Sequence, residues 1–292
     1  QSDFFAQEEL RYGDNIVGKQ ELERQKGETQ KSLFGNERIY VQILLQFKQL
    51  ITLDFPKSIA AQGGENLTKE MIAAKFPVTL AVVLAGLLFA VAVGVPLGVF
   101  AALKRNSWVD YLLMALSSIG MALPPYVLAV LLALFFSVFL RDIPLLSLPS
   151  EGFESWRSLI MPGIALGAAP LAMIARFIRA SLLETLEREY IITARAKGLN
   201  PLQVVLKHAL RPSLVPAITI IGPQVGSMLV GSVLVENIFR LQGLGMLFVR
   251  SIENRDTPVV ITTIFVLSAL VMFVNLVIDL LYPLIDPRME LE

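Results

Sequence analysis

The sequence predicts an all-α fold, a polytopic bundle of membrane-spanning helices, and three observations support that prediction. Hydrophobic residues make up 54% of the 292 residues and charged residues 17%, whereas soluble domains carry about 25% charged residues. The charges are also uneven, because residues 1–75 hold 21 of them and residues 76–292 hold only 29. Five stretches of residues 76–292 lack charge over the roughly 18 residues that a membrane-spanning helix needs. We therefore expect a polar segment at 1–75 and a membrane domain at 76–292.

The five uncharged stretches are predicted as membrane spans, at residues 76–103, 111–140, 158–175, 212–235 and 257–278. As one helix the second would be about 45 Å long, more than the ~30 Å hydrocarbon core needs. It contains Pro124 and Pro125, which predict a kink or a break. A broken span is tolerated only inside protein or beside a cavity, so we expect this helix beside the pore. An ordinary proline kink in a packed helix is the alternative.

Small and polar residues recur four positions apart in several spans. The glycine pairs Gly94/Gly98, Gly163/Gly167 and Gly222/Gly226 let helices approach closely in lipid, which indicates a multi-helix bundle. Asn275 and Asp279 share a face of the last span, close to its cytoplasmic boundary. We expect a structural hydrogen bond to a neighbouring helix there, with a functional ionisable group as the alternative.

Composition excludes several classes of function. A formal net charge of zero argues against a nucleic-acid-binding protein. The absence of cysteine excludes disulfides, thiol catalysis and cysteine-ligated metals. The one histidine, His208, leaves little for metal or proton chemistry, and we expect it to be a packing or interfacial residue. The sequence therefore predicts no catalytic residue and no metal site in this chain.

Lysine and arginine in short loops predict the orientation of the spans. The loop after the first span holds Lys104 and Arg105, and residues 176–211 hold seven basic residues. Both segments are predicted to be cytoplasmic, and they agree because two spans separate them. The two remaining loops, with two and three basic residues, then lie outside, whereas the C-terminal residues 286–292 lie inside.

This orientation places residues 1–75 on the extracytoplasmic side. Six of them recur at helical spacing and predict one amphipathic helix on the membrane or the bundle: Ile39, Ile43, Leu44, Phe47, Leu50 and Ile51. Because the chain begins at Gln1, we expect a further membrane helix upstream, with a cleaved signal peptide as the alternative. The stretch 13–20 nearly fits a phosphate-binding loop, but Gln20 stands where Ser or Thr must hold Mg²⁺. We expect a polar loop there.

Residues 176–216 predict a helix–turn–helix elbow between two spans. Apolar residues at helical spacing continue the span at 158–175 as an amphipathic helix: Leu182, Leu183, Leu186, Tyr190, Ile191 and Ala194. Gly198 is predicted to end this helix, Asn200 to cap the next one and Pro201 to begin it. A basic elbow in the cytosol is a rigid contact for a partner protein, and a connector lying on the membrane surface is the alternative.

Motifs along this region resemble the ABC importer permeases, the inner-membrane components of binding-protein-dependent transport. YIITARAKGL (190–199) and KHALRPSLVP (207–216) are similar to the cytoplasmic loop of the dipeptide, oligopeptide and nickel branch. Further stretches are similar to that branch: FPVTL (76–80), GSVLVENIFRLQGLGMLF (231–248), NRDTPVV (254–260) and NLVIDLLYPLIDPR (275–288). The resemblance covers residues 40–288 and implies a family fold of six helices, of which this chain holds five.

The sequence departs from the family pattern at several positions. The family signature is EAA, three residues and Gly; here Ile192 and Thr193 occupy its first two positions, and Ala194 and Gly198 are kept. This departure is usual in the peptide branch. Three other departures from the pattern of the peptide branch bear on the substrate subgroup and not on the class of protein. Gln242 stands where the branch commonly has Pro, and Pro283 stands where a small residue is commoner. The stretch LDFPKS (53–58) lacks the glycines that are usual there.

The resemblance implies one of two membrane-spanning subunits of an ATP-driven importer for peptides, in the bacterial cytoplasmic (inner) membrane. It implies as partners a second permease in a heterodimer, two cytoplasmic ATPases and an extracytoplasmic substrate-binding protein. ATP and magnesium would bind the ATPases, so no cofactor is expected in this chain. The elbow at 184–201 would contact the ATPases through Glu189, Tyr190, Thr193, Ala194, Arg195, Ala196, Lys197, Gly198 and Leu199.

Other functions remain as alternatives. The same machinery could import nickel or glutathione-like solutes. A secondary transporter would use inverted repeats and charges within the membrane, but no repeat is evident and the spans are uncharged. A membrane-embedded hydrolase would need a nucleophile and a base in the bilayer, and the one histidine lies in the elbow region.

Overall fold

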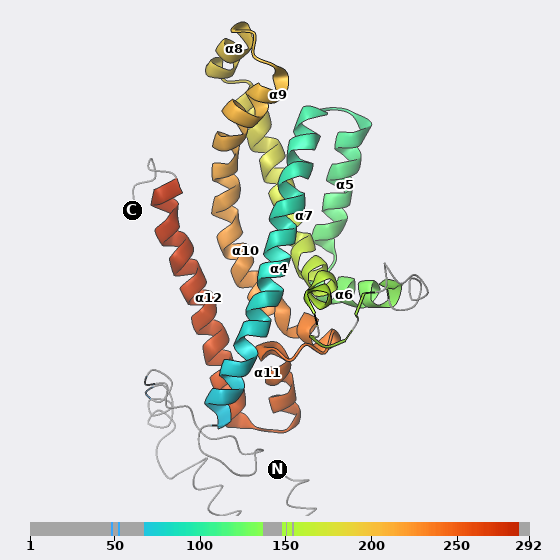
Figure 1. Ribbon diagram of the computed structural model, residues 1–292, viewed down its shortest axis with the longest axis vertical. Coiled ribbons are helices and arrows are strands. Elements are labelled where there is room, and N and C mark those ends of the chain that lie inside the picture. The colour runs from blue at the N-terminus through green and yellow to red at the C-terminus, as the bar shows by residue number, and fades with distance from the viewer. Residues whose placement is uncertain are drawn as a thin grey trace, which may run out of the picture. The chain divides into compact units, whose positions relative to one another are not determined.

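The computed structural model of the chain describes residues 48, 52, 67–136, 148–149, 151–153 and 155–285. The expected polar loop at 13–20 and, apart from Lys48, the amphipathic helix at 39–51 lie outside the described residues. Within the described residues every regular element is a helix, as the sequence predicts. The α-helices are α4 (Leu67–Leu103), α5 (Trp108–Ala122), α6 (Pro125–Leu134), α7 (Ile160–Leu186), α8 (Glu189–Ala196), α9 (Pro201–Gln203), α10 (Leu210–Ile238), α11 (Leu244–Glu253) and α12 (Thr257–Ile285) (Figure 1).

The chain divides into two compact units. The first combines residues 1–71 with 250–265, and its described part contains the turn between α11 and α12. The second combines residues 72–249 with 266–292. It holds nearly all of α4, all of α5 to α10 and the predicted elbow, so the elbow can be analysed within one unit.

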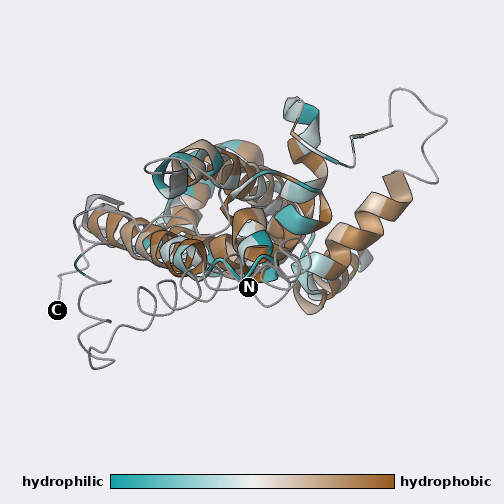
Figure 2. Cartoon of the chain, turned by 90° about the horizontal axis from the view of Figure 1, so that it is seen from below, coloured by the Kyte–Doolittle hydropathy of each residue, from teal (hydrophilic) through white to brown (hydrophobic). Residues whose placement is uncertain are grey.

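Three helical stretches are long and apolar enough to cross a membrane: Thr68–Leu103, Trp156–Leu186 and Thr257–Ile278. Two further pairs of helices meet the same criterion together but are bent, by 104° between α5 and α6 and by 46° within residues 204–238. The described part of the chain therefore has three spans, or up to five if each bent pair is one span, in line with the five predicted. Figure 2 shows that hydrophobic residues dominate the long helices.

The break in the second predicted span lies at the two prolines. α5 ends at Ala122, Leu123 and Pro124 are extended with ψ angles of 121° and 141°, and α6 begins at Pro125. The residue before a proline is displaced from the helical region, and a proline has no N–H to donate, so a continuous helix cannot pass. The structure thus shows a break and not a mild kink, and α6 runs across the direction of α5 (Figure 1).

α7 is the most enclosed of the long helices in the second unit. In the most apolar 18 residues of the stretch Trp156–Leu186, which contains α7, 61% of the residues are buried. The corresponding share is 33% for Thr68–Leu103 of α4. The two helices meet at the predicted glycines, because a Cβ on Gly94 would lie 2.9 Å from a carbonyl oxygen of α7, and one on Gly98 2.5 Å from that of Ala175. Gly167 of α7 likewise lies directly against the backbone of Gly86. The backbones therefore approach as closely as the glycine spacing predicts.

The third glycine pair packs against α12. A Cβ on Gly222 would lie 2.8 Å from the Ile278 side chain, and one on Gly226 3.3 Å from that of Val271. The amide oxygen of Asn275 is 3.7 Å from the same position on Gly226, so this polar side chain faces α10. The predicted glycine contact between neighbouring helices is thus confirmed here as well.

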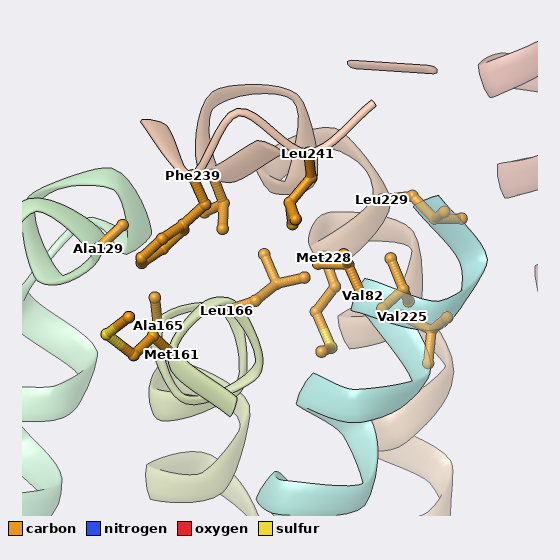
Figure 3. Close-up of a cluster of buried hydrophobic side chains, with 12 residues drawn as sticks. Val82, Ala129, Met161, Ala165, Leu166, Val225, Met228, Leu229, Phe239 and Leu241 are labelled. Atoms are coloured by element: carbon orange, nitrogen blue, oxygen red, sulfur yellow. The ribbon is translucent and has the colours of Figure 1, made fainter. Parts of the chain in front are cut away.

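Buried apolar side chains join several helices near the C-terminal end of α10. Val82 of α4, Leu166 of α7 and Met228 of α10 lie in one cluster with Ala129 of α6 and Leu241 (Figure 3). Ala129 is fully buried in it. The cluster anchors the broken helix α6 to the same core that holds α7 and α10.

A buried carboxylate fixes the turn that follows α10. Glu236 is fully buried, and its Oε2 accepts the N–H of Gly245 over 2.8 Å at the start of α11. Thr79 Oγ1 on α4 accepts the neighbouring N–H of Leu244 over 2.8 Å. Anionic groups are favoured at helix N-termini, where N–H groups lack partners within the helix. Gly243 is required in this turn, because a Cβ on it would collide with the carboxylate of Glu236.

We expect Gly98→Ala to lower the free energy of unfolding by about 1–3 kcal/mol, the usual cost of overpacking. The added methyl would lie 2.5 Å from the Ala175 carbonyl oxygen and 2.8 Å from Ile178 Cβ, so α4 and α7 would have to separate. Thermal unfolding of the purified subunit in detergent measures the effect.

Gly120→Ala is the matched control, because its methyl would meet nothing closer than 3.4 Å. Alanine is the better helix former by about 1 kcal/mol, so this variant should be as stable as the parent or slightly more so. Equal destabilisation by the two substitutions would contradict a glycine-dependent contact between α4 and α7.

Candidate functional site

The predicted elbow connects α7 to α10 and projects from one end of the helices of the second unit (Figure 1). It consists of α8, a turn around Gly198, the short helix α9 and a π-helix at Val204–Ala209 that leads into α10. In the π-helix the backbone N–H of Leu210 bonds to the carbonyl of Val205, five residues back. This wider helix places Val204, Val205 and Ala209 on the inner side of the elbow, where all three are buried.

The expectation of one continuous helix from α7 to Ala194 is wrong. α7 ends at Leu186, where the N–H of Glu187 and Arg188 bond to carbonyls three residues back, over 3.3 and 3.1 Å. Arg188 is then extended, with ψ 147°, and α8 starts at Glu189. The break redirects α8 so that part of its apolar stripe packs on the π-helix instead of extending along the axis of α7.

Local backbone chemistry fixes the turn between α8 and α9. Gly198 has φ +78°, a left-handed conformation that only glycine adopts without strain, and its N–H bonds to the Arg195 carbonyl over 3.0 Å. Asn200 Oδ1 accepts the N–H of Leu202 over 3.1 Å, and α9 begins at Pro201. The predicted helix stop at Gly198, cap at Asn200 and start at Pro201 are confirmed.

The inner face of the elbow has its own small apolar core. Ile191 is fully buried and Ala194 is 7% exposed, and they pack with Leu182 of α7, Val204 and Val205. Ala102 at the end of α4 belongs to the same cluster. The core holds α8 against the membrane helices, so the elbow is a packed structure and not a loose connector.

A buried polar contact joins the two arms at the base of the elbow. The Ser213 Oγ of α10 lies 2.7 Å from the carbonyl oxygen of Ala209 and 3.2 Å from the Thr185 Oγ1 of α7. Both hydroxyl side chains are buried. Because buried hydroxyl groups are costly to leave unpaired, this contact helps to fix the separation of α7 and α10 where the elbow begins.

The outer face presents most of the residues that resemblance assigns to partner contact. Glu189, Tyr190, Thr193, Arg195, Ala196, Lys197, Gly198 and Leu199 are all exposed. Ala194 is not, because its side chain points into the elbow core. Three further apolar side chains of the elbow are more exposed than Leu199: Ile192 and Leu202, at 59% each, and Leu206, at 52%. They fall outside the predicted stripe, which was the available sign that they face outward.

The remaining predicted residues lie apart from the elbow. Pro124 and Pro125 stand at the break between α5 and α6, and Asn275 lies on the contact of α12 with α10. The Asp279 side chain lies outside the described residues. His208 is exposed on the π-helix of the elbow.

Known proteins are similar in sequence to this chain over most of its length. Residues 94–291 match the family described as binding-protein-dependent transport system inner membrane component. The dipeptide transport system permease protein DppB of Bacillus subtilis is 38% identical over 257 residues, 88% of this chain and 81% of that protein. The oligopeptide transport system permease protein OppB of Haemophilus influenzae is 37% identical, over 87% of this chain and 82% of that protein. The glutathione transport system permease protein GsiC of Escherichia coli K12 is 38% identical, over 85% of each.

The fold is also that of a solved transporter chain. A chain of the MetNI methionine ABC transporter, in an inward facing conformation, aligns with a TM-score of 0.63 at 20% identity. The alignment covers 76% of this chain and all of that one. This likeness confirms the helical membrane fold. The family match over residues 94–291 and the relatives show that the chain belongs to the inner membrane components of binding-protein-dependent transport systems, which are transport subunits and not enzymes.

Proposed function

We propose that this chain forms half of the membrane pathway of an ATP-driven importer of peptides, and that the elbow is the surface on which the ATPases act. The observation that supports this most is the construction of the elbow. Its inner face is packed and hydrogen-bonded onto α7 and α10, whereas its outer face exposes Ile192 and Leu202 beside the cations of Arg195 and Lys197. Exposed apolar side chains rimmed by charge are typical of a protein-binding surface.

Peptides are the substrate class that the relatives support. The three relatives are named for transport of dipeptides, oligopeptides and glutathione, and glutathione is itself a tripeptide. A pathway for such solutes must accept a backbone with both charged and apolar side chains. We therefore expect the membrane pathway to be permissive and a separate extracytoplasmic binding protein to select the solute.

The orientation follows from the distribution of basic residues. Lys104 and Arg105 lie at the same end of the second unit as the elbow, and Arg105 pairs with Glu187 there over 2.9 Å. This basic end is proposed to be cytoplasmic. At the other end of α7, Arg240 pairs with Glu151 over 2.9 Å, and this end is proposed to be extracytoplasmic.

The same orientation places residues 1–75 outside and residues 286–292 inside. The elbow then faces the compartment that contains ATP. ATP and magnesium are proposed to bind two partner ATPases and not this chain. A second permease, in a heterodimer with this one, completes the pathway.

Rigidity is what the elbow contributes to transport. A partner can displace the membrane helices only if the surface that it pushes is fixed to them. The core around Ile191 and the contact between Ser213 and Thr185 provide that connection. The turn at Gly198 holds the outer face in one conformation.

Gly198→Val tests the proposed function. Valine at φ +78° costs roughly 1 kcal/mol or more in backbone strain, and its side chain would occupy the surface where the partner docks. We expect the complex to assemble with its ATPases but to lose ATP hydrolysis stimulated by the loaded binding protein, together with uptake into proteoliposomes.

Gly152→Val is the matched control, since Gly152 has φ +74° and, like Gly198, nothing within 4 Å of a Cβ. It carries the same backbone strain at the other end of α7. It should retain stimulated hydrolysis and uptake. Normal coupling in Gly198→Val, or equal loss in both variants, would contradict the role of the elbow.

The charges of the outer face give a second test. Arg195→Glu and Lys197→Glu should each weaken association with the ATPases by about three- to tenfold, and the effect should shrink at high salt, because rim charges act through a screened field. Titration of the permease complex in nanodiscs with purified ATPase measures the affinity. Arg240→Glu, which changes an exposed arginine at the other end, should bind the ATPase as the parent does.

A further inference from the structure

A buried ion pair ties α5 to α7 near the elbow. Asp110 is 1% exposed, and its two carboxylate oxygens accept the Nε and Nη2 groups of Arg179 over 2.6 Å each. A bidentate pair of this kind fixes orientation as well as distance. Arg179 lies on α7 two turns before that helix ends at Leu186. The pair thus joins α5 to the helix that supports the elbow.

The short turn between α4 and α5 is fixed to the same place. Asn106 has φ +60°, and its backbone N–H donates to Asp110 Oδ2 over 3.0 Å. Ser107 caps α5 by accepting the Asp110 N–H over 3.4 Å. Arg105 pairs with Glu187, between α7 and α8, over 2.9 Å. This second ion pair is exposed on both sides, so it contributes little by itself, and Asp110 is the centre of the arrangement.

Further contacts continue along the two helices toward the break. Arg176 of α7 donates to Ser118 Oγ of α5. One turn beyond, a Cβ on Gly120 would lie 3.7 Å from the Cβ of Ala172, so the helices touch closely there. α5 is therefore held against α7 from its first turn almost to its end at Ala122.

The joint between α5 and α6 contrasts with this. Leu123 and Pro124 are extended, and neither Pro124 nor Pro125 can donate a backbone hydrogen bond across the joint. α6 leaves at 104° and is anchored at the opposite end of α7 from Arg179, through Ala129 in the core with Met161 and Leu241. A change of a few backbone angles at Leu123 and Pro124 is the simplest way for α5 to move relative to α6.

We propose that Asp110 and Arg179 are positioning residues that make α5 move with α7, so that a displacement of the elbow reaches the joint at Leu123–Pro124. The inference rests on the proposed function, because it assumes that a partner displaces the elbow. Through this pair a displacement of the elbow would reach the membrane domain along α5, in addition to α7 and α10. In this proposal the pair acts through the two helices that it joins and not by contact with the solute or the ATPases.

The experiment uses the assembled importer in proteoliposomes, with dialanine and its binding protein as the probe. It measures basal ATP hydrolysis, stimulated hydrolysis and dialanine imported per ATP. Asp110→Asn should lower the import per ATP roughly fivefold, within the range found for substitutions along coupling networks, and leave basal hydrolysis unchanged. Asp110→Asn with Arg179→Gln removes both charges and should show the same fall, not a larger one. Glu184→Gln, which removes the exposed ion pair with Arg188 within the elbow segment, is the matched control and should couple as the parent does.

A disulfide then separates a positioning role from a merely stabilising one. The sequence has no cysteine, and the 3.7 Å between the Cβ positions of Gly120 and Ala172 is within the roughly 3.5–4.5 Å that a disulfide spans. Oxidised Gly120→Cys/Ala172→Cys should transport as well as its reduced form, because α5 and α7 move together. In the Asp110→Asn background, oxidation should restore import per ATP.

Two results would overturn the inference. One is loss of transport on oxidation in the otherwise unchanged chain, which would show that α5 and α7 must slide; it decides the matter even if the Asp110 variants do not assemble. The other is normal import per ATP in an assembled Asp110→Asn importer. Failure of the proposed function is distinct from both, because dialanine and its binding protein would then not stimulate hydrolysis in the unmodified complex.

Discussion

The close contact between α4 and α7 is the constraint on which the rest of the second unit depends. At Gly94, Gly98 and Gly167 the backbones approach to a distance that admits no side chain larger than hydrogen. In a membrane, where apolar helices gain little from the hydrophobic effect, such packing is a main source of attraction. It fixes α7 in place, and α7 then positions α5 through Asp110 and α10 through the contact at Ser213.

The elbow is the continuation of this arrangement outside the membrane helices. Two residues separate α7 from α8, and the break at Arg188 allows α8 to fold back onto the π-helix. The result is a structure with its own core around Ile191, closed by a glycine turn at Gly198. Because each arm is fixed to a membrane helix, a force on the outer face is transmitted and not absorbed. This is the physical basis of the proposal that the elbow is the surface on which the ATPases act.

Much of this could be predicted from the sequence, wherever the determinant is local. The uncharged stretches, Pro124 and Pro125, Gly198 and Asn200 each act within a few residues, and their predicted spans, break, helix stop and cap are confirmed. The helical spacing of apolar residues did not predict the break at Arg188, because the apolar stripe of α7 and α8 continues across it. Packing of α8 on the π-helix imposes the break. The same packing buries Ala194, which a linear motif places beside exposed neighbours.

Contacts between distant residues could not be predicted. Nothing local marks Glu236 as the group that caps α11, or Asp110 as the partner of Arg179, 69 residues away. In the sequence Asp110 stands at the edge of an apolar stretch, where a charged residue normally indicates the end of a membrane span. Only the fold shows that its side chain is buried and paired with Arg179.

The most direct test of the account is to ask what touches the outer face of the elbow in the working complex. A photoreactive p-benzoylphenylalanine can replace Ile192, which is 59% exposed on the elbow, and, in a second sample, Trp156, which is 73% exposed at the other end of α7. Irradiation of the assembled importer should join position 192 to an ATPase subunit and position 156 to none. An intact, ATP-hydrolysing complex in which position 192 never joins an ATPase subunit would contradict the elbow as the site of coupling.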